Sequence, residues 1–458
     1  MSIFGAMTNA VTGLRAQSFA LENISDNIAN SQTTGYKRVD TSFQDLVPDY
    51  PLSQQVGGSV IASSRGTNTV AGNYTNTAVS TNVALNGAGF FVVRDRADTQ
   101  AGLPIFSQRD LYTRRGDFSL DKNGFLVNGA GRYMVGTNLD PTTGALTGSP
   151  GVLQFNGGYV PAVISKQIDY KVNLPAMPVT AAYDPTVADS ELLPAASATA
   201  TVTGANDAAF ERNTVSGGNV TLYDGQGAPV TVQIRWGKLA NGTTTPAAPD
   251  QWAMYYSNPA YDPSAATAAT DTMWFSDSNT AATAFEFDSA GKLTKPTSGS
   301  MDMTNLKIDG TNPIKFDVSS GLTQFSDVSG QVKSSSVRQD GYPAGKFDGI
   351  NIESDGRIVA SYSNGQTQAL AQLEVARFNA PNALKRKDGS TFEETLESGQ
   401  PLYGLNGGSI LGAQLESSNT DIAEEFSKMI ITQQAYSANT RVVTTSQQML
   451  QDAINIIR

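Results

Sequence analysis

Acidic residues beside glycine are the first candidates for chemistry in this sequence. The segment DKNGFLVNGAGR, residues 121–132, superficially resembles a calcium-binding loop, because Asp121 and Asn123 could supply oxygen ligands. Such a loop needs glycine at its sixth position and glutamate at its twelfth, where this chain has Leu126 and Arg132. The flanking residues look like strands rather than helices. We therefore predict a β-hairpin here and no metal site.

Carboxylates in an aromatic setting are the second candidate, because a pair of them can hydrolyse a glycosidic bond. The nearest arrangement is Asp250 followed by Trp252, Tyr255 and Tyr256, a run more typical of the core of a β-domain. The chain has no histidine and no cysteine, which excludes disulfides, Cys or His metal sites and histidine-dependent triads. We predict a protein that is not an enzyme and has no catalytic, cofactor-binding or metal-binding residues.

An Arg-Gly-Asp triplet at residues 115–117 could be a cell-adhesion ligand if it formed an exposed turn. It lies between the strand-like runs DLY and FSLD. We predict instead a strand with a salt-bridging turn.

The composition narrows the range of partners. The net charge of −11 is unfavourable for nucleic acid and for an anionic membrane surface. No stretch is long and apolar enough to cross a bilayer, so we expect no membrane insertion. Only 16% of the residues are charged, which implies a surface rich in Ser, Thr, Asn and Gln. The first residues lack the basic segment of a secretory signal.

The elements that position these residues differ between the middle and the ends of the chain. A short pattern recurs in the middle as FSLDKNGFL, FEFDSAGKL and INIESDGRI, residues 118–126, 285–293 and 350–358. Two apolar residues alternate with another residue, an acidic residue follows, and a glycine stands two positions before the next apolar residue. This pattern predicts strand, tight turn and strand. We expect an all-β middle, with Ala- and Pro-rich loops at residues 175–207 and 258–272.

Both ends of the chain carry apolar residues at a spacing of seven, which is typical of helices that pack along one seam. The N-terminal series is Met7, Leu14, Leu21 and Ile28, and the C-terminal series is Ile422, Met429, Tyr436, Val443, Leu450 and Ile457. Neither helix can bury its seam alone, so we predict that the two pair. The simpler alternative is a helical hairpin within one monomer. The length and polar interruptions of the C-terminal seam favour further partners from neighbouring chains.

Three asparagines lie on another side of the N-terminal helix, at Asn23, Asn27 and Asn30, before a break at Gly35 and Tyr36. Asparagine is unfavourable inside a helix because its amide competes for backbone hydrogen bonds. One interpretation is a solvated face near a helix end. The other is that these amides contact neighbouring subunits or line the junction with the linker that follows.

Several segments resemble the bacterial flagellar axial proteins, the family of rod, hook and hook-junction subunits. The motifs are NISDNIANSQTTGYKR near the N-terminus, ALNGAGFFVV, YTRRGDFSLDKNGFLVNGAGRYMVG, residues 339–384 and QQAYSANTRVVTTSQQMLQ near the C-terminus. Only about residues 175–313 are less specific. The length and the central β-motifs resemble the hook members more than the shorter rod members.

The resemblance implies an α+β multidomain fold in which paired, coiled-coil-like terminal helices enclose inserted all-β domains. The expected parts are a helical assembly domain (1–38 with 415–458), a linker (39–81 with 400–414), an inner β-domain (82–150 with 320–399) and one or more outer β-domains (151–319).

The resemblance also implies a structural subunit that polymerises with itself into a curved hollow tube outside the cell. The implied partners are the distal rod, hook cap and hook-filament junction proteins and the flagellar type III export apparatus. Two alternatives remain at this point: a distal rod subunit, or a secreted β-rich adhesin or glycan-binding protein.

Overall fold

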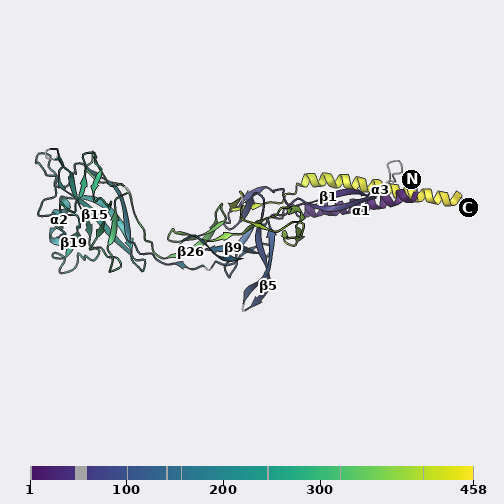
Figure 1. Ribbon diagram of the computed structural model, residues 1–458, viewed down its shortest axis with the longest axis horizontal. Coiled ribbons are helices and arrows are strands. Elements are labelled where there is room, and N and C mark those ends of the chain that lie inside the picture. The colour runs from purple at the N-terminus through teal and green to yellow at the C-terminus, as the bar shows by residue number, and fades with distance from the viewer. Residues whose placement is uncertain are drawn as a thin grey trace. The chain divides into compact units, whose positions relative to one another are not determined.

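The computed structural model describes residues 3–46, 59–100, 102–140, 143–155, 157–244, 247–319, 321–405 and 407–456. The chain divides into two compact units (Figure 1). Unit 1 comprises Met1–Gly158, Phe347–Tyr362 and Gln366–Arg458, and unit 2 comprises Tyr159–Lys346 and Ser363–Gly365. Unit 2 is therefore an insertion into unit 1. The finer division into four parts remains a prediction.

Two long helices stand at the ends of unit 1, α1 (Ile3–Ala29) and α3 (Ile422–Ile456). They pack against each other, as the purple and yellow ribbons of Figure 1 show. The buried positions of α1 are mostly small and recur every three or four residues: Ala10, Gly13, Ala16, Ala20 and Ile24. A Cβ atom built on Gly13 would lie 3.0 Å from the side-chain amide of Asn439. Small residues therefore allow the two helix backbones to approach closely.

Helix α3 begins with a cap and remains largely exposed. The Asp421 carboxylate accepts hydrogen bonds from the backbone N–H groups of Ala423 (2.8 Å) and Glu424 (3.2 Å), which satisfies donors that a helix start leaves free. Large apolar side chains along α3 lie more than a third exposed, among them Phe426, Ile430, Ile431, Met449 and Ile454. No helix in the described ranges combines the length and apolar character that a bilayer crossing requires.

The strands of unit 1 form a large antiparallel sheet and three separate two-stranded pairs. They are β1 (Val39–Leu46), β2 (Ser59–Gly66), β3 (Tyr74–Asn76), β4 (Val83–Asn86), β5 (Phe90–Gln100), β6 (Leu103–Thr113), β7 (Phe118–Leu120), β8 (Leu126–Asn128), β9 (Tyr133–Leu139), β10 (Leu146–Val152), β26 (Gly345–Ile352), β27 (Arg357–Tyr362), β28 (Thr367–Leu373), β29 (Val375–Arg377), β30 (Lys385–Lys387), β31 (Thr391–Glu393), β32 (Leu402–Tyr403), β33 (Ser409–Gly412) and β34 (Gln414–Glu416). The separate pairs are β1 with β2, which lies beside α1, β3 with β34, and β4 with β33. The main path of the large sheet is β26-β27-β28-β9-β5-β6-β31-β30.

The three copies of the recurring pattern each form the predicted hairpin. β7 pairs with β8, β20 with β21, and β26 with β27. The shared glycines Gly124, Gly291 and Gly356 have φ values of 80°, 75° and 87°, a region that favours glycine. In the calcium-like segment, Asp121 accepts hydrogen bonds from the N–H groups of Asn123 and Phe125. Its carboxylate therefore closes a turn.

Unit 2 contains two larger sheets around a shared core and a separate pair of short strands. Its elements are β11 (Tyr159–Val160), β12 (Gln167–Pro175), β13 (Thr201–Thr203), α2 (Asp207–Arg212), β14 (Val215–Tyr223), β15 (Pro229–Ala240), β16 (Thr243–Thr244), β17 (Ala247–Ala248), β18 (Asp250–Ser257), β19 (Thr272–Phe275), β20 (Phe285–Phe287), β21 (Leu293–Lys295), β22 (Ser300–Met303), β23 (Ile314–Asp317), β24 (Thr323–Phe325) and β25 (Lys333–Gln339). One sheet has the order β22-β23-β12-β24 with β25 on β12, and the other β13-β19-β18-β15-β14 with β20 on β18. The short strands β16 and β17 pair with each other. Trp252, Tyr255 and Tyr256 are fully buried on β18, which confirms their prediction as core residues. The Ala- and Pro-rich segments are mostly irregular, except for β13 and the start of α2.

Candidate functional site

The asparagines of α1 meet the segment that follows the helix in the same chain. Asn27 is 1% exposed and uses every hydrogen-bonding position of its amide. Its Nδ2 donates to the Val39 carbonyl (2.9 Å) and to Glu425 Oε2 (3.0 Å). Its Oδ1 accepts from the Val39 N–H (2.9 Å) and from the Tyr36 hydroxyl (3.2 Å). We call Asn27, Tyr36, Val39 and Glu425 the asparagine clamp.

The other two asparagines play smaller parts. Asn23 donates to Thr41 Oγ1 on β1 (2.9 Å) and lies 3.5 Å from Ser64 Oγ on β2. Asn30 donates to the Asp26 carbonyl one turn earlier and accepts from Thr33. Asn23 and Asn27 therefore line the junction between α1 and the β1–β2 hairpin, which was one of the expected roles.

Gly35 and Tyr36 bring the end of α1 against the large sheet. Gly35 has φ = 67°, and a Cβ atom on it would lie 2.5 Å from the backbone nitrogen of Arg115, so no other residue fits there without displacement. Its N–H donates to the Glu416 carbonyl (2.8 Å). The ring of Tyr36 is buried, and the Arg386 guanidinium lies over it at 4.2 Å from its centre.

A buried ion cluster adjoins the asparagine clamp. Lys37, Arg114 and Glu416 are 2%, 4% and 0% exposed. Lys37 Nζ donates to Glu416 Oε1 at 2.5 Å, and Arg114 Nη1 donates to Glu416 Oε2 at 3.2 Å. We call these three residues the glutamate cluster. It joins the end of α1, the large sheet and the strand that leads into α3.

The linker after β2 completes the glutamate cluster. Glu416 Oε1 accepts a third hydrogen bond from the Gly72 N–H (2.9 Å), and Lys37 Nζ also donates to the Val70 carbonyl (2.7 Å). Burial lowers the pKa of Lys37, and the charge and hydrogen bond of Glu416 offset only part of that effect. Removing one partner of a buried ion pair is costly, so this geometry holds four distant chain segments together.

In the single chain, the predicted seam residues that the structure describes are less buried than Asn27 and Tyr36. Of the predicted seam, Met7, Leu14, Leu21, Ile28, Met429, Val443 and Leu450 are half-buried, and Ile422 and Tyr436 are exposed. Ile457 lies outside the described residues. Small residues of α1 also lie at the contact with α3, as Gly13 does beside Asn439. The role of the seam in assembly remains a prediction.

Sequence reasoning missed the charged members of this site. Lys37 and Arg114 stand inside the quoted motifs GYKR and YTRRGDF, but nothing local connects them to Glu416 or Glu425. The partners are 379 residues apart for Lys37 and Glu416 and 398 apart for Asn27 and Glu425. The predicted salt bridge at residues 115–117 is confirmed, because Arg115 Nε and Asp117 Oδ1 pair at 2.7 Å in the segment between β6 and β7.

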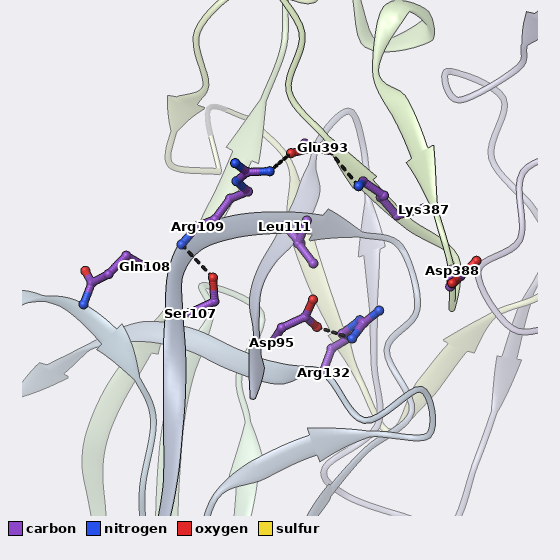
Figure 2. Close-up of a pocket in the computed structure, with 9 residues that line it drawn as sticks. All are labelled: Asp95, Ser107, Gln108, Arg109, Leu111, Arg132, Lys387, Asp388 and Glu393. Carbon is purple, nitrogen blue, oxygen red and sulfur yellow. Dashed lines mark hydrogen bonds and ion pairs between the residues drawn. The ribbon is translucent and has the colours of Figure 1, made fainter. Parts of the chain in front are cut away.

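A cleft with charged walls lies elsewhere in unit 1 and is drawn in Figure 2. Its volume is about 740 Å³, and Figure 2 shows charged side chains from several strands around it. Arg109 and Lys387 both pair with Glu393, and Arg132 pairs with Asp95. Opposite charges therefore neutralise one another across this cleft. Within the described ranges, no group of three or more acidic side chains is placed to hold a metal ion.

Models of flagellar protein families match four stretches of the chain. They are the flagella basal body rod protein at residues 7–37, the flagellar hook protein FlgE/F/G D1 domain at 84–175, the flagellar basal body protein FlaE D2 domain at 188–342, and the flagellar basal body rod FlgEFG protein C-terminal region at 412–456. The first and last stretches coincide with the paired helices and with most of the asparagine clamp.

Whole relatives match over their full length. Flagellar hook protein FlgE of Brucella suis is 29% identical over 464 residues, covering 100% of both chains. The FlgE proteins of Salmonella typhimurium and Escherichia coli are each 28% identical, covering 98% of this chain and 100% of theirs. The crystal structure of Helicobacter pylori flagellar hook protein FlgE2 covers 75% of this chain and 100% of its own, with 17% identity and a TM-score of 0.47. The chain belongs to the family of bacterial flagellar hook proteins.

Proposed function

We propose that this protein is the structural subunit of the flagellar hook, a curved hollow tube that copies of the chain build and that transmits torque from the rod to the filament as a universal joint. The observation that carries the proposal is the pair of terminal helices with apolar side chains left in water. Phe4 on α1 and Ile431 on α3 are 67% and 66% exposed. The described part of a single chain covers only about a third of each of these side chains.

Burial by neighbouring copies would make assembly favourable. Full burial of a large apolar side chain contributes about 1.5–3 kcal/mol, so half-exposed side chains can each add roughly 1 kcal/mol. Phe4, Phe426, Ile430, Ile431, Met449 and Ile454 are all at least half exposed. In this proposal the heptad residues of both helices extend the same surface, and parallel packing of many helix pairs gives the inner wall of the tube.

A universal joint must resist twist, and the glutamate cluster supplies a connection suited to that task. It holds α1, the linker, the large sheet and the strand before α3 through a buried carboxylate with three donors. Buried ion pairs with several hydrogen bonds tolerate little displacement. Twist applied to the helices would therefore pass to the sheet without a flexible step between them.

Bending of the tube requires contacts between copies that can be exchanged easily, and we assign these to unit 2. Unit 2 has a polar surface with many aspartates that close their own turns, such as Asp184, Asp309 and Asp327. Contacts between such surfaces include water and can be exchanged at low cost. We propose that copies slide over one another there while the inner helices remain packed.

The proposal includes the four-part layout, an extracellular location and export through the flagellar type III apparatus. It also includes contacts with the distal rod, hook cap and hook-filament junction proteins. A chain without cysteine can form no disulfides during unfolded passage through an export channel.

Electron microscopy of the concentrated protein tests the function directly. We expect curved hollow tubes. Straight tubes would favour a distal rod subunit instead. A protein that stays monomeric at high concentration and binds glycans would contradict the proposal.

A further inference from the structure

Next to the glutamate cluster lies a pocket of different chemistry, which we call the arginine pocket. Its volume is about 410 Å³, and its walls include Tyr74, Gly89, Phe90, Arg114, Arg377 and Phe378. Phe90 and Phe378 contribute apolar faces, and their ring centres are 6.3 Å apart. None of the described lining residues is acidic. The pocket is therefore apolar and positively charged.

The arginines of this pocket have unused donors. Arg114 is only 4% exposed, and its buried Nε has no hydrogen-bond partner in the described part of the chain. Its other nitrogens donate to Glu416 and to the carbonyls of Leu85 and Gly87. The guanidinium of half-buried Arg377 makes no hydrogen bond or ion pair with the part of the chain that the structure describes. A buried donor without a partner is unfavourable.

The local charge is also unbalanced. Lys37 and Arg114 share the single carboxylate of Glu416, and Arg377 adds a third cation beside them. Uncompensated charge in a poorly hydrated place is costly. A carboxylate accepts two parallel hydrogen bonds from a guanidinium, so an entering carboxylate would satisfy both the charge and the free donors.

We propose that the arginine pocket receives a segment of a second copy that carries a carboxylate beside an apolar side chain. This inference rests on the proposed assembly function. The pocket is cationic and the chain as a whole carries a net charge of −11, so copies offer the complementary sign. Suitable segments exist: Leu396 is 95% exposed and is flanked by exposed Glu394 and Glu397.

In this proposal, the arginine pocket of one copy contacts a different surface, the acidic segment, on the next copy. Such heterologous contacts generate rings, or open helical filaments where the rotation does not close, rather than closed dimers. The arginine pocket would therefore contribute direction and register to the polymer, in addition to the non-directional burial of the helices.

The cysteine-free chain makes the pocket directly testable. Ala88 is an exposed lining residue, and Ala88→Cys introduces a single thiol for a maleimide-linked photocrosslinker. The labelled chain is polymerised with ¹⁵N-labelled wild-type chain, irradiated, digested and analysed by mass spectrometry. We expect crosslinks to ¹⁵N peptides that contain Asp or Glu beside an apolar residue. Tubes in which only the labelled chain's own peptides are crosslinked would overturn the inference.

A charge reversal provides the second measurement. We expect Arg377→Glu to slow elongation at least about tenfold, a factor equal to 1.4 kcal/mol, without changing the unfolding of the monomer. The matched control is Arg357→Glu, since Arg357 is exposed and pairs with exposed Asp355. Equal elongation of both variants would also overturn the inference. If the wild-type chain forms no tubes, the proposed function fails rather than the pocket.

Discussion

Asn27 satisfies all four hydrogen-bonding positions of its amide within its own chain. Asn23 on the same helix donates one hydrogen bond to Thr41 on β1, and Asn30, just after the helix, donates to the carbonyl of Asp26 one turn earlier. The unfavourable helix propensity of asparagine, about 0.7 kcal/mol or less, is small beside the contacts that Asn27 makes. The asparagine clamp therefore explains why an amide stands at this position of α1.

We predict that Asn27→Leu lowers the free energy of unfolding by roughly 3 kcal/mol or more. A leucine of similar size leaves the Val39 N–H, the Val39 carbonyl and the Glu425 carboxylate without this partner, and each unsatisfied buried group costs about 1–3 kcal/mol. Urea unfolding followed by circular dichroism measures the change. Asn30→Ala is the control, with an expected change below about 1 kcal/mol. Wild-type stability of Asn27→Leu would contradict the clamp.

A second prediction for a single residue concerns Glu416. Glu416→Gln leaves Lys37 and Arg114 buried without their counter-ion, and breaking a buried pair in this way costs about 3–5 kcal/mol. We expect faster hydrogen exchange at the Gly72 amide, which donates to Glu416. The double variant Lys37→Met with Glu416→Gln should regain part of the loss, because one cation is removed as well.

The control for Glu416 is Glu353→Gln, because Glu353 is exposed. We expect no change at the Gly72 amide in that variant. If Glu416→Gln and Glu353→Gln behaved alike, the glutamate cluster would not hold the segments together.

At the scale of elements, the contact between α1 and α3 depends on small residues. A side chain at Gly13 would collide with Asn439 on α3, whereas the position of Gly5 is open, with nothing within 4 Å. We predict that Gly13→Leu separates the helices at a cost of about 1–3 kcal/mol and that Gly5→Leu does not. Hydrogen exchange along α1 in the polymer distinguishes the two. Equal protection in both variants would refute the close approach.

The start of α3 gives a prediction about pH. Hydrogen bonds from Lys428 and Arg38 lower the pKa of Glu424 below its ordinary value of 4.5. The unfolded chain therefore binds this proton more readily, and stability rises with pH in this range. The contribution is complete above about pH 4.5 and is lost as the pH falls through the lowered pKa. We expect Glu424→Gln to flatten the acid limb of stability against pH, measured by urea unfolding from pH 5 to 3.

Elements with a local signal could be predicted from the sequence, and contacts between distant elements could not. Turn glycines such as Gly124 have their own conformational requirement, so the hairpins followed directly. The heptad spacing identified both helices and predicted that Leu14 and Leu21 lie in the seam between them. It did not indicate the contact of Gly13 with Asn439, because close backbone approach depends on small residues that carry little hydrophobic signal. The glutamate cluster joins residues of ordinary type whose proximity exists only in the folded chain.

At the scale of the whole molecule, the insertion of unit 2 separates assembly from shape. Both terminal helices and the glutamate cluster belong to unit 1. The surfaces proposed to drive polymerisation therefore lie outside unit 2. Unit 2 has its own core of two sheets. Changes on its surface should therefore leave polymerisation intact and alter only how outer contacts are exchanged.

Val328 provides the test, because it is fully exposed near exposed Phe325 on unit 2. An apolar side chain in water at such a position is a candidate for contact with another copy. We predict that Val328→Asp yields tubes of normal length with altered or lost curvature in electron micrographs. Ala266→Asp adds the same charge at another exposed position of unit 2 and should retain wild-type curvature. Loss of all polymer in Val328→Asp would contradict the separation, because assembly would then depend on unit 2 as well as on the terminal helices.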